Sequence, residues 1–324
     1  MPAQSVRRRT RANANFRPAD ADLRRDVPSC RDGLTSFSRD LYMETNPAPI
    51  RNAMTVDVED YFQVSAFAPY IPREAWPSIS CRVESNIDRI LALLDNENTK
   101  ATFFTLGWIA QRYPAMVRRI VGNGHELASH GWAHHRVTDQ APHEFRDDIT
   151  RAKAILEDIG GQPVLGYRAP SFSIGRQNQW ALSVLEESGY RYSSSIYPVQ
   201  HDHYGMPDAP RFAYYPHSTG GLLELPITTM RLFSRNIPAG GGGYFRLWPY
   251  PVSRWFIQRL NRLEHRAAIF YFHPWEIDHQ QPRQKGISVK TRFRHYYNLH
   301  RMEERIRALT RDFKWGRMDR IFLD

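Results

Sequence analysis

The sequence predicts an α/β fold in which a parallel sheet closes, or nearly closes, into a barrel. Short runs rich in β-forming residues alternate with amphipathic stretches whose apolar residues recur at helical spacing. Polar clusters follow the predicted strands directly, as in barrels whose chemistry lies at the C-terminal ends of the strands. Repeated strand–helix units indicate a parallel sheet, and this many units favour a barrel.

The predicted elements cover most of the chain after residue 53. Strands are predicted at 54–58, 101–106, 125–129, 164–167, 192–196, 222–225 and 268–272, and helices at 83–94, 109–121, 142–159 and 179–188. The helix at 142–159 has Pro142 at its start and Gly160 after its end, the usual asymmetry of helix termini. Gly240–Gly243 is predicted to be a substrate-side loop or tight turn, since the Lys and Ser or Thr of a phosphate loop do not follow it.

Two regions are predicted. Residues 1–50 hold nine Arg, no Lys and scattered Pro, so this basic N-terminal extension is expected to be disordered. Residues 51–324 are expected to form one catalytic domain with a C-terminal helical extension. Translation could also start at Met43.

Charge and composition restrict the partners and the location. The formal net charge is +10, and the chain from Gln281 onward carries 12 Lys or Arg against five acidic residues. This balance favours a solvated basic face, with contact to a membrane surface or an acidic glycan as the alternative. A nucleic-acid partner is not expected. With two Cys, no export signal and no apolar run of about 18 residues, we expect a cytoplasmic protein, at most peripheral to the inner membrane.

The first chemical cluster is the segment Ser129–His135, directly after a predicted strand. His130 and His134 are four residues apart, so on a helical turn both imidazoles would reach one divalent cation. Alone, two histidines at this spacing are more often structural than metal ligands. A third ligand is needed to favour a metal site.

Three carboxylates follow the first predicted strand. Asp57, Glu59 and Asp60 lie where the chain leaves the barrel, and such a concentration of like charge is costly unless a cation or an Arg neutralises it. An exposed acidic loop is the alternative, although Tyr61 and Phe62 follow at once. Two imidazoles and a carboxylate are a donor set that suits zinc or a similar catalytic ion.

Two further polar residues follow predicted strands. Arg168 follows the strand that ends at Tyr167, and in a pocket it could pair with Asp57 and keep that carboxylate ionised. His273 follows the very apolar strand 268–272 and could act as a general acid, with a satisfied core histidine as the equal alternative.

In these four clusters the chain resembles the polysaccharide deacetylases of carbohydrate esterase family 4, which act on chitooligosaccharides and peptidoglycan. The resemblance is greatest to the branch found in exosortase-associated exopolysaccharide loci. It rests on DVEDYF, ATFFTLGW, GHELASHGWAHH, YRAPSFS, GGGGYFR and FYFHPWEID, which occur in this order between Asn52 and Arg317. Several motifs in a fixed order are far more specific than any one of them.

The resemblance implies a distorted (β/α) barrel of about seven units and a role for each matched residue. Asp57 would be the general base held by Arg168, and His273 the general acid. His130 and His134 would bind a divalent metal, with zinc the expected ion. The backbone N–H of Ser171 would contact the oxyanion, although the family usually has Tyr at this position.

Two departures from the family pattern affect the predicted site. The family usually has two adjacent aspartates in the first motif, so the third metal ligand here is either Glu59 or Asp60. Alternation along an extended strand places Asp57 and Glu59 on one side and favours Glu59, whereas a turn after Val58 would favour Asp60. At Ser193, relatives often carry an aspartate before two serines, so the role of that side chain is open.

The predicted function is metal-dependent hydrolysis of N-acetyl groups from the amino sugars of a polysaccharide or its lipid-linked precursor, in exopolysaccharide biosynthesis. Aromatic residues near strand ends could stack on sugar rings; the candidates are Trp132, Phe172, Tyr244, Trp248 and Trp275. The alternatives are hydrolysis of another C–N bond, such as that of a cyclic amide or ureide, and an inactive glycan-binding relative.

Overall fold

The computed structural model describes residues 49–202, 204–217 and 220–324. The predicted disordered extension and Met43 therefore lie almost wholly outside the described residues. Strands are β1 (Arg51–Val58), β2 (Thr102–Thr105), β3 (Glu126–Ser129), β4 (Gly166–Tyr167), β5 (Tyr192–Ser193), β6 (Leu223–Glu224), β7 (Thr229–Leu232), β8 (Arg235–Pro238), β9 (Ile269–Phe272) and β10 (Lys314–Gly316). Helices are α1 (Val83–Asn96), α2 (Gly107–Arg112), α3 (Pro114–Gly122), α4 (Pro142–Gly160), α5 (Trp180–Glu187), α6 (Gly242–Leu247), α7 (Tyr250–Arg259), α8 (Val289–Tyr296), α9 (Met302–Asp312) and α10 (Met318–Phe322).

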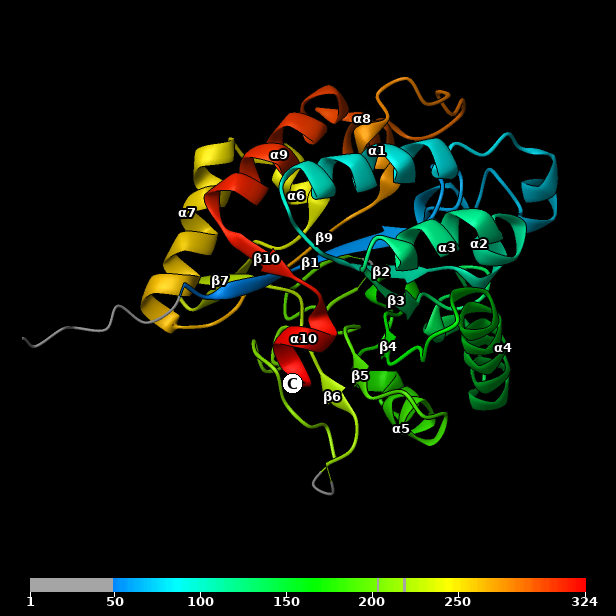
Figure 1. Ribbon diagram of the computed structural model, residues 1–324, viewed down its shortest axis with the longest axis horizontal. Coiled ribbons are helices and arrows are strands. Elements are labelled where there is room, and N and C mark those ends of the chain that lie inside the picture. The colour runs from blue at the N-terminus through cyan, green and yellow to red at the C-terminus, as the bar shows by residue number, and fades with distance from the viewer. Residues whose placement is uncertain (1–48, 203, 218–219) are drawn as a thin grey trace, which may run out of the picture. The chain divides into compact units, whose positions relative to one another are not determined.

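The main sheet is parallel and curled, with helices along its outside (Figure 1). It has eight strands, of which seven follow the order β10-β1-β2-β3-β4-β5-β6, while β9 pairs with β1. Every pairing in it is parallel. The predicted α/β barrel is confirmed.

The central strand β1 has the most pairing partners. Its first residues pair with β10, its middle with β9 and its last four with β2. All but the first of its residues are buried, as expected for a strand covered on both faces. The largest apolar cluster joins β1 to the helices through fully buried side chains such as Val56, Phe103 and Leu127, each of which contributes about 1.5–3 kcal/mol to stability.

The strand register determines where the predicted site residues lie. Val58 pairs with Thr105, Thr105 with Ser129, and Ser129 with Tyr167. The strands therefore end at the same edge of the sheet, and the polar segments that follow β1, β3, β4 and β9 come together there.

The helix predicted at 109–121 is wrong as one element, since the structure has α2 and α3. Pro114 has no N–H to continue the α2 ladder, and it disfavours the helical conformation at the residue before it. Tyr113 accordingly leaves the helical region, with φ −128° and ψ 59°.

The segment between β6 and β9 contains structure that the strand and helix patterns did not predict. β7 and β8 form an antiparallel hairpin, and α6 and α7 follow it. The segment predicted as a loop at Gly240–Gly243 leads into α6, which begins at Gly242. A Cβ at Gly241 would lie 2.7 Å from the Tyr271 ring, so glycine is needed for the close approach to β9.

None of the helices in the described ranges is both long enough and apolar enough to cross a membrane. Cys81 is a free thiol, and Cys30 lies outside the described residues.

Candidate metal centre and active site

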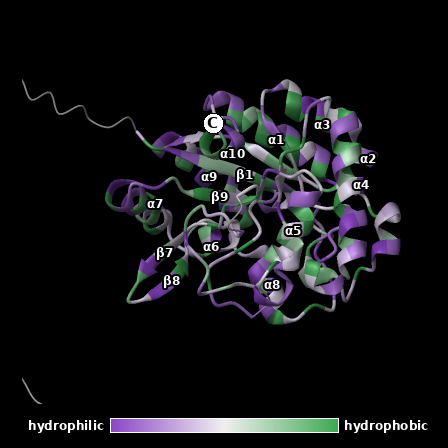
Figure 2. Cartoon of the chain, turned by 90° about the horizontal axis from the view of Figure 1, so that it is seen from below, coloured by the Kyte–Doolittle hydropathy of each residue, from purple (hydrophilic) through white to green (hydrophobic). Residues whose placement is uncertain are grey.

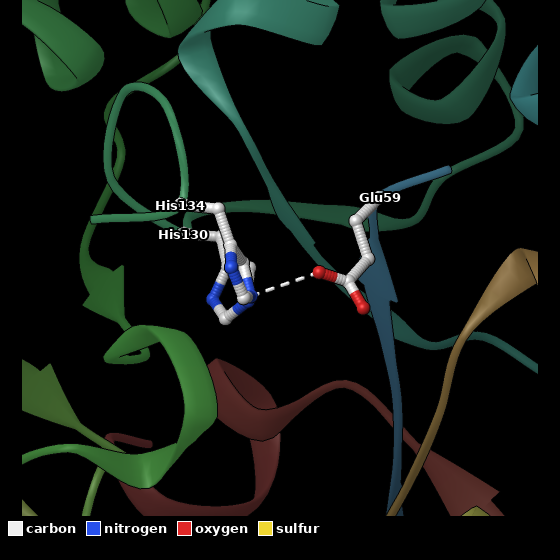
Figure 3. Close-up of side chains that lie close together, drawn as sticks. All are labelled: Glu59, His130 and His134. Atoms are coloured by element: carbon white, nitrogen blue, oxygen red, sulfur yellow. Dashed lines mark ion pairs between the residues drawn. The ribbon is translucent and has the colours of Figure 1, made fainter. Parts of the chain in front are cut away.

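Three predicted ligands meet at the C-terminal edge of the sheet (Figure 3). Glu59 follows β1, and His130 and His134 follow β3. Each offers one ligand atom, these atoms all lie within 4.8 Å of one another, and all three residues are buried. The structure therefore brings these three predicted residues together.

The two histidines do not lie on a helical turn, so that part of the prediction is wrong. Residues 130–136 form an irregular loop, in which Gly131 has φ +75° and His134 φ +53°. A left-handed conformation costs a non-glycine residue about 1–2 kcal/mol, a strain often found at functional sites. In this loop conformation the centroids of the two imidazole rings lie 5.4 Å apart.

A hydrogen bond leaves one ring nitrogen of His130 available for a metal ion. Its Nδ1 lies 2.8 Å from the carbonyl oxygen of Arg168. Because a carbonyl oxygen only accepts, Nδ1 carries the proton and Nε2 is left with its lone pair, a common arrangement for metal-binding histidines. Burial lowers the pKa of His130 to about 4, so the imidazole is neutral, as a ligand must be.

Glu59 fits a cation bound between it and the histidines. Its Oε2 lies 2.8 Å from His134 Nε2. This oxygen has no hydrogen-bond partner among the described residues. Burial acts to raise the pKa of Glu59, but the charges of His134 and His273 outweigh it and lower the pKa to about 2. An ionised carboxylate and two imidazoles are a donor set that suits zinc.

Asp60, the alternative third ligand, is not part of this cluster. Its Oδ2 accepts hydrogen bonds from the backbone N–H of Arg82 and Val83, at 2.5 and 2.9 Å, and its Oδ1 accepts from Tyr61 N. It therefore satisfies donors at the start of α1. Burial raises the pKa of Asp60 to about 6.

Asp57 and Arg168 form a buried ion pair, and Asp57 lines the same pocket as the three candidate ligands. Arg168 Nη1 donates to Asp57 Oδ1 at 2.6 Å and to Thr55 Oγ1 at 2.8 Å. The guanidinium lies 4.0 Å from the centroid of the Phe104 ring and also donates to Ser194. With no exposed side-chain surface, Arg168 can hold Asp57 in one orientation.

His273 lies on the other side of Glu59, with Nε2 3.5 Å from Glu59 Oε1. Its Nδ1 donates to Glu276 Oε1 at 2.7 Å, and Glu276 Oε2 accepts from Arg246 Nε at 2.7 Å. Burial acts to lower the pKa of His273, but the charge of Glu59 and the hydrogen bond to Glu276 raise it to about 9. The imidazole can therefore carry a proton at neutral pH.

Glu276 and Arg246 are site residues that the sequence reasoning missed. Both are fully or almost fully buried. A Cβ at Gly242 would lie 2.3 Å from Glu276 Oε1, so the glycine run lets the backbone pass next to this carboxylate. The signal was present, because an acid three residues after His273 and an Arg after the glycine run are both in the quoted motifs.

The site opens into a pocket of ≈ 750 Å³, within the size range of ligand sites. Its lining includes Asp57, the three candidate ligands and His273. Ser171 also lines it, with φ +54° and its Oγ 2.6 Å from Ser65 Oγ.

Two of the five aromatic residues predicted to stack on sugars, Phe172 and Trp275, line this pocket. Trp132 lines a neighbouring pocket of ≈ 580 Å³ that shares Arg73, Arg136 and Asp139 with the first. Tyr244 and Trp248 line neither of these pockets.

Two family profiles match the chain between residues 76 and 323. Residues 76–193 match the polysaccharide deacetylase profile. Over this segment the chain is similar to the polysaccharide deacetylases. Residues 194–323 match a second profile, described as a domain of unknown function, DUF3473. This second region supplies His273, Glu276 and Arg246, so the pocket draws on both matched regions of the chain.

Several curated proteins are similar to part of this chain. A peptidoglycan-N-acetylglucosamine deacetylase of Bacillus cereus is 34% identical over 29% of this chain and 34% of its own length. The peptidoglycan-N-acetylglucosamine deacetylase PgdA of Listeria monocytogenes is 34% identical over 31% of this chain and 20% of its own length. A peptidoglycan deacetylase-like protein of Gibberella zeae is 30% identical over 34% of this chain and 32% of its own. The chain thus matches about a third of these relatives or less.

One solved structure supports the fold over most of the chain. It is a Mycobacterium smegmatis protein named for the polysaccharide deacetylases, which superposes with a TM-score of 0.53 at 20% identity. The match covers 85% of this chain and 92% of that one. At this identity the likeness concerns the fold alone.

Proposed function

We propose that this protein is a metal-dependent hydrolase that removes N-acetyl groups from the amino sugars of a glycan. The observation that carries the proposal is the meeting of Glu59, His130 and His134 with the pair Asp57–Arg168 and with His273 in one pocket. The substrate class is supported by the names of the relatives, two peptidoglycan-N-acetylglucosamine deacetylases and one peptidoglycan deacetylase-like protein.

The three ligands would hold one divalent cation, for which zinc is the proposed identity. Such an ion acts as a Lewis acid toward an amide carbonyl and lowers the pKa of a bound water. The remaining chemistry belongs to side chains that the structure places around the ligands.

Asp57 would act as the general base. Arg168 holds Oδ1 of this carboxylate, which leaves Oδ2 to accept a proton from the attacking water. Ser171 lines the pocket, and its backbone N–H is the proposed donor to the oxyanion of the tetrahedral intermediate.

His273 would act as the general acid. It donates a proton to the sugar nitrogen as the C–N bond breaks, so that the products are acetate and a free amino sugar. Glu276 accepts from Nδ1, fixes the ring and leaves Nε2 directed toward Glu59 and the ligands. No covalent intermediate is required.

The biological setting is also part of the proposal. The similarity to the exosortase-associated branch favours a role in exopolysaccharide biosynthesis, on the polymer or on its lipid-linked precursor. We propose cytoplasmic action, with peripheral contact to the inner membrane. Fractionation of the native protein into the periplasm would contradict this location.

Two alternatives keep the site but change the function. The same residues could hydrolyse a cyclic amide or ureide, or the chain could bind glycan without hydrolysis. The test is acetate release from a panel of N-acetylated oligosaccharides, next to ring opening of cyclic amides and ureides, by metal-loaded protein. Release of acetate establishes the deacetylase. Ring opening alone favours the first alternative, and glycan binding without release favours the second.

A further inference from the structure

The helix α8 and the loop before it form a basic surface beside the pocket. No Asp or Glu occurs from His279 to Met302, a stretch that contains six Lys or Arg. All six are exposed, and five of them form, with three apolar residues, what we call the α8 surface: Arg283, Lys285, Val289, Lys290, Arg292, Phe293, Arg294 and Tyr297. Figure 2 shows α8 at the lower edge of the view, on the outside of the described chain.

The apolar part of the α8 surface has the spacing of one helix face. Val289 is 84% exposed, Phe293 51% and Tyr297 39%. They are four residues apart, so they lie one above the other, and the rings of Phe293 and Tyr297 are 4.7 Å apart. A single exposed apolar side chain is ordinary, but a row of three among cations needs an explanation.

The opposite side of α8 is fixed to the pocket wall. His295 is buried and stacks on Trp275 with centroids 4.2 Å apart. Arg246 donates to the carbonyl oxygens of Arg294, His295 and Tyr297, at the end of the helix. The exposed residues are therefore held outward on an anchored helix, and turning inward to bury Phe293 would break these contacts.

We propose that the α8 surface docks on a bilayer that contains anionic lipids. Cations beside aromatic and aliphatic side chains on one helix face are typical of helices that lie in the interface of a membrane. The cations complement anionic headgroups, and Val289 and Phe293 are apolar enough to enter the headgroup region. Soluble acidic glycan is the weaker alternative, because an aliphatic side chain such as Val289 has no stacking face for a sugar.

One acid lies close to the α8 surface and reduces its charge. Asp202 pairs with Lys290 at 2.7 Å and with Arg294 at 3.4 Å. Arg283, Lys285 and Arg292 have no ion pair with any described acid. They leave the surface with an excess of positive charge.

The place of the α8 surface connects docking to the substrate. Thr291 and Arg294 line the pocket, so a bilayer bound at α8 lies beside its mouth. If the proposed deacetylase activity holds, a glycan attached to lipid would reach the pocket without leaving the membrane surface. Docking itself does not depend on that activity.

The test is co-sedimentation of the full chain with vesicles of phosphatidylcholine, alone and mixed equally with phosphatidylglycerol. We expect binding only to the mixed vesicles, and the double variant Val289→Ser/Phe293→Ser to bind at least about tenfold more weakly, since burial of two apolar side chains is lost. Leu263→Ser, another exposed apolar residue, is the matched control and should bind as the wild type does. Thermal unfolding checks that the variants fold.

Amide hydrogen exchange identifies the segment that binds. Mixed vesicles should slow exchange in residues 283–297, whereas binding through another segment leaves this exchange unchanged and would overturn the proposal. Dextran sulfate serves as a soluble polyanion. If it slows the same amides equally, and the double Ser variant still binds vesicles as the wild type does, the surface belongs to an acidic glycan and not to a membrane. Neither readout needs catalysis, so failure here is distinct from failure of the deacetylase proposal.

Discussion

His273 Nδ1 lies 2.7 Å from Glu276 Oε1, and the other oxygen of Glu276 accepts from Arg246 Nε at the same distance. Glu276 therefore positions His273, the proposed general acid, and buried Arg246 holds Glu276 in place. Ser193 lies where relatives often carry an aspartate, and here its Oγ is hydrogen-bonded to Ser195 Oγ, 2.8 Å away. In this chain Glu276 is the carboxylate that contacts His273 Nδ1.

Glu276→Gln keeps the shape of the side chain but removes its charge and places an amide against Arg246. We expect kcat to fall by about 10- to 100-fold, a part of the 10²–10⁴ that general acid–base catalysis contributes, with KM little changed. Glu276→Asp should recover part of the loss.

Stability is the control for this prediction, because breaking a buried pair costs about 3–5 kcal/mol. Kinetics are measured well below the unfolding temperature of each variant. Glu264→Gln, which breaks the pair with Arg211 outside the pocket lining, should leave kcat unchanged. A wild-type kcat in Glu276→Gln would contradict the positioning role.

Asp57→Asn should separate proton transfer from metal binding. Asn can still accept from Arg168, so the variant is expected to fold and to bind zinc, while acetate release falls by about 10²- to 10⁴-fold. Zinc content by atomic absorption and acetate release are measured on the same samples. Loss of zinc from this variant would make Asp57 a ligand and not a base.

Glu59→Gln and Asp60→Asn distinguish the two candidates for the third ligand. Glu59→Gln should weaken zinc binding, since a neutral amide replaces the carboxylate next to the histidines. Asp60→Asn should keep zinc but lower the unfolding free energy by about 1 kcal/mol, because its carboxylate accepts at the start of α1. Isothermal titration with zinc measures the first effect and urea unfolding the second. The reverse pattern would assign the metal to Asp60.

The pH dependence of stability should contain a contribution from Glu126. Burial and the nearby charge of Asp319 raise the pKa of Glu126 to about 7, while its ordinary value is 4.5. Between these values the folded state binds more protons than the unfolded state, so this contribution is complete below 4.5 and is lost as the pH rises through about 7.

Glu126→Gln should remove that contribution. The fall in unfolding free energy from about pH 5 to about pH 8 should be smaller in the variant than in the wild type. Urea unfolding at both values measures the difference, and other titrating groups cancel when the two proteins are compared. An equal fall in both would show that Glu126 ionises normally in the folded state.

The sequence predicted the barrel because its strands are buried on both faces and its helices carry clear apolar periodicity, as in β1 and α1. The four polar clusters could be placed together because parallel strands end at one edge. The predicted helical turn of His130 and His134 was wrong because their arrangement depends on backbone conformation. The bend of the His130–His134 loop needs positive φ at His134, which residue spacing does not reveal.

The region after β6 was the least predictable. The hairpin of β7 and β8 and the short helix α6 lie outside the repeating strand–helix pattern. The contact of Arg246 with Glu276 joins residues 30 positions apart, and only the packing of the α6 segment against β9 creates it. Local patterns give the residue types at such a site but not their pairing.

The most direct test of the central claim is zinc titration of the chelator-treated protein, followed by acetate release from an N-acetylated oligosaccharide. Wild type should regain activity in proportion to zinc and reach its maximum at one ion per chain, whereas His134→Ala should regain little at the same zinc concentration. Full activity without metal, or equal recovery in His134→Ala, would contradict a metal centre built from Glu59, His130 and His134.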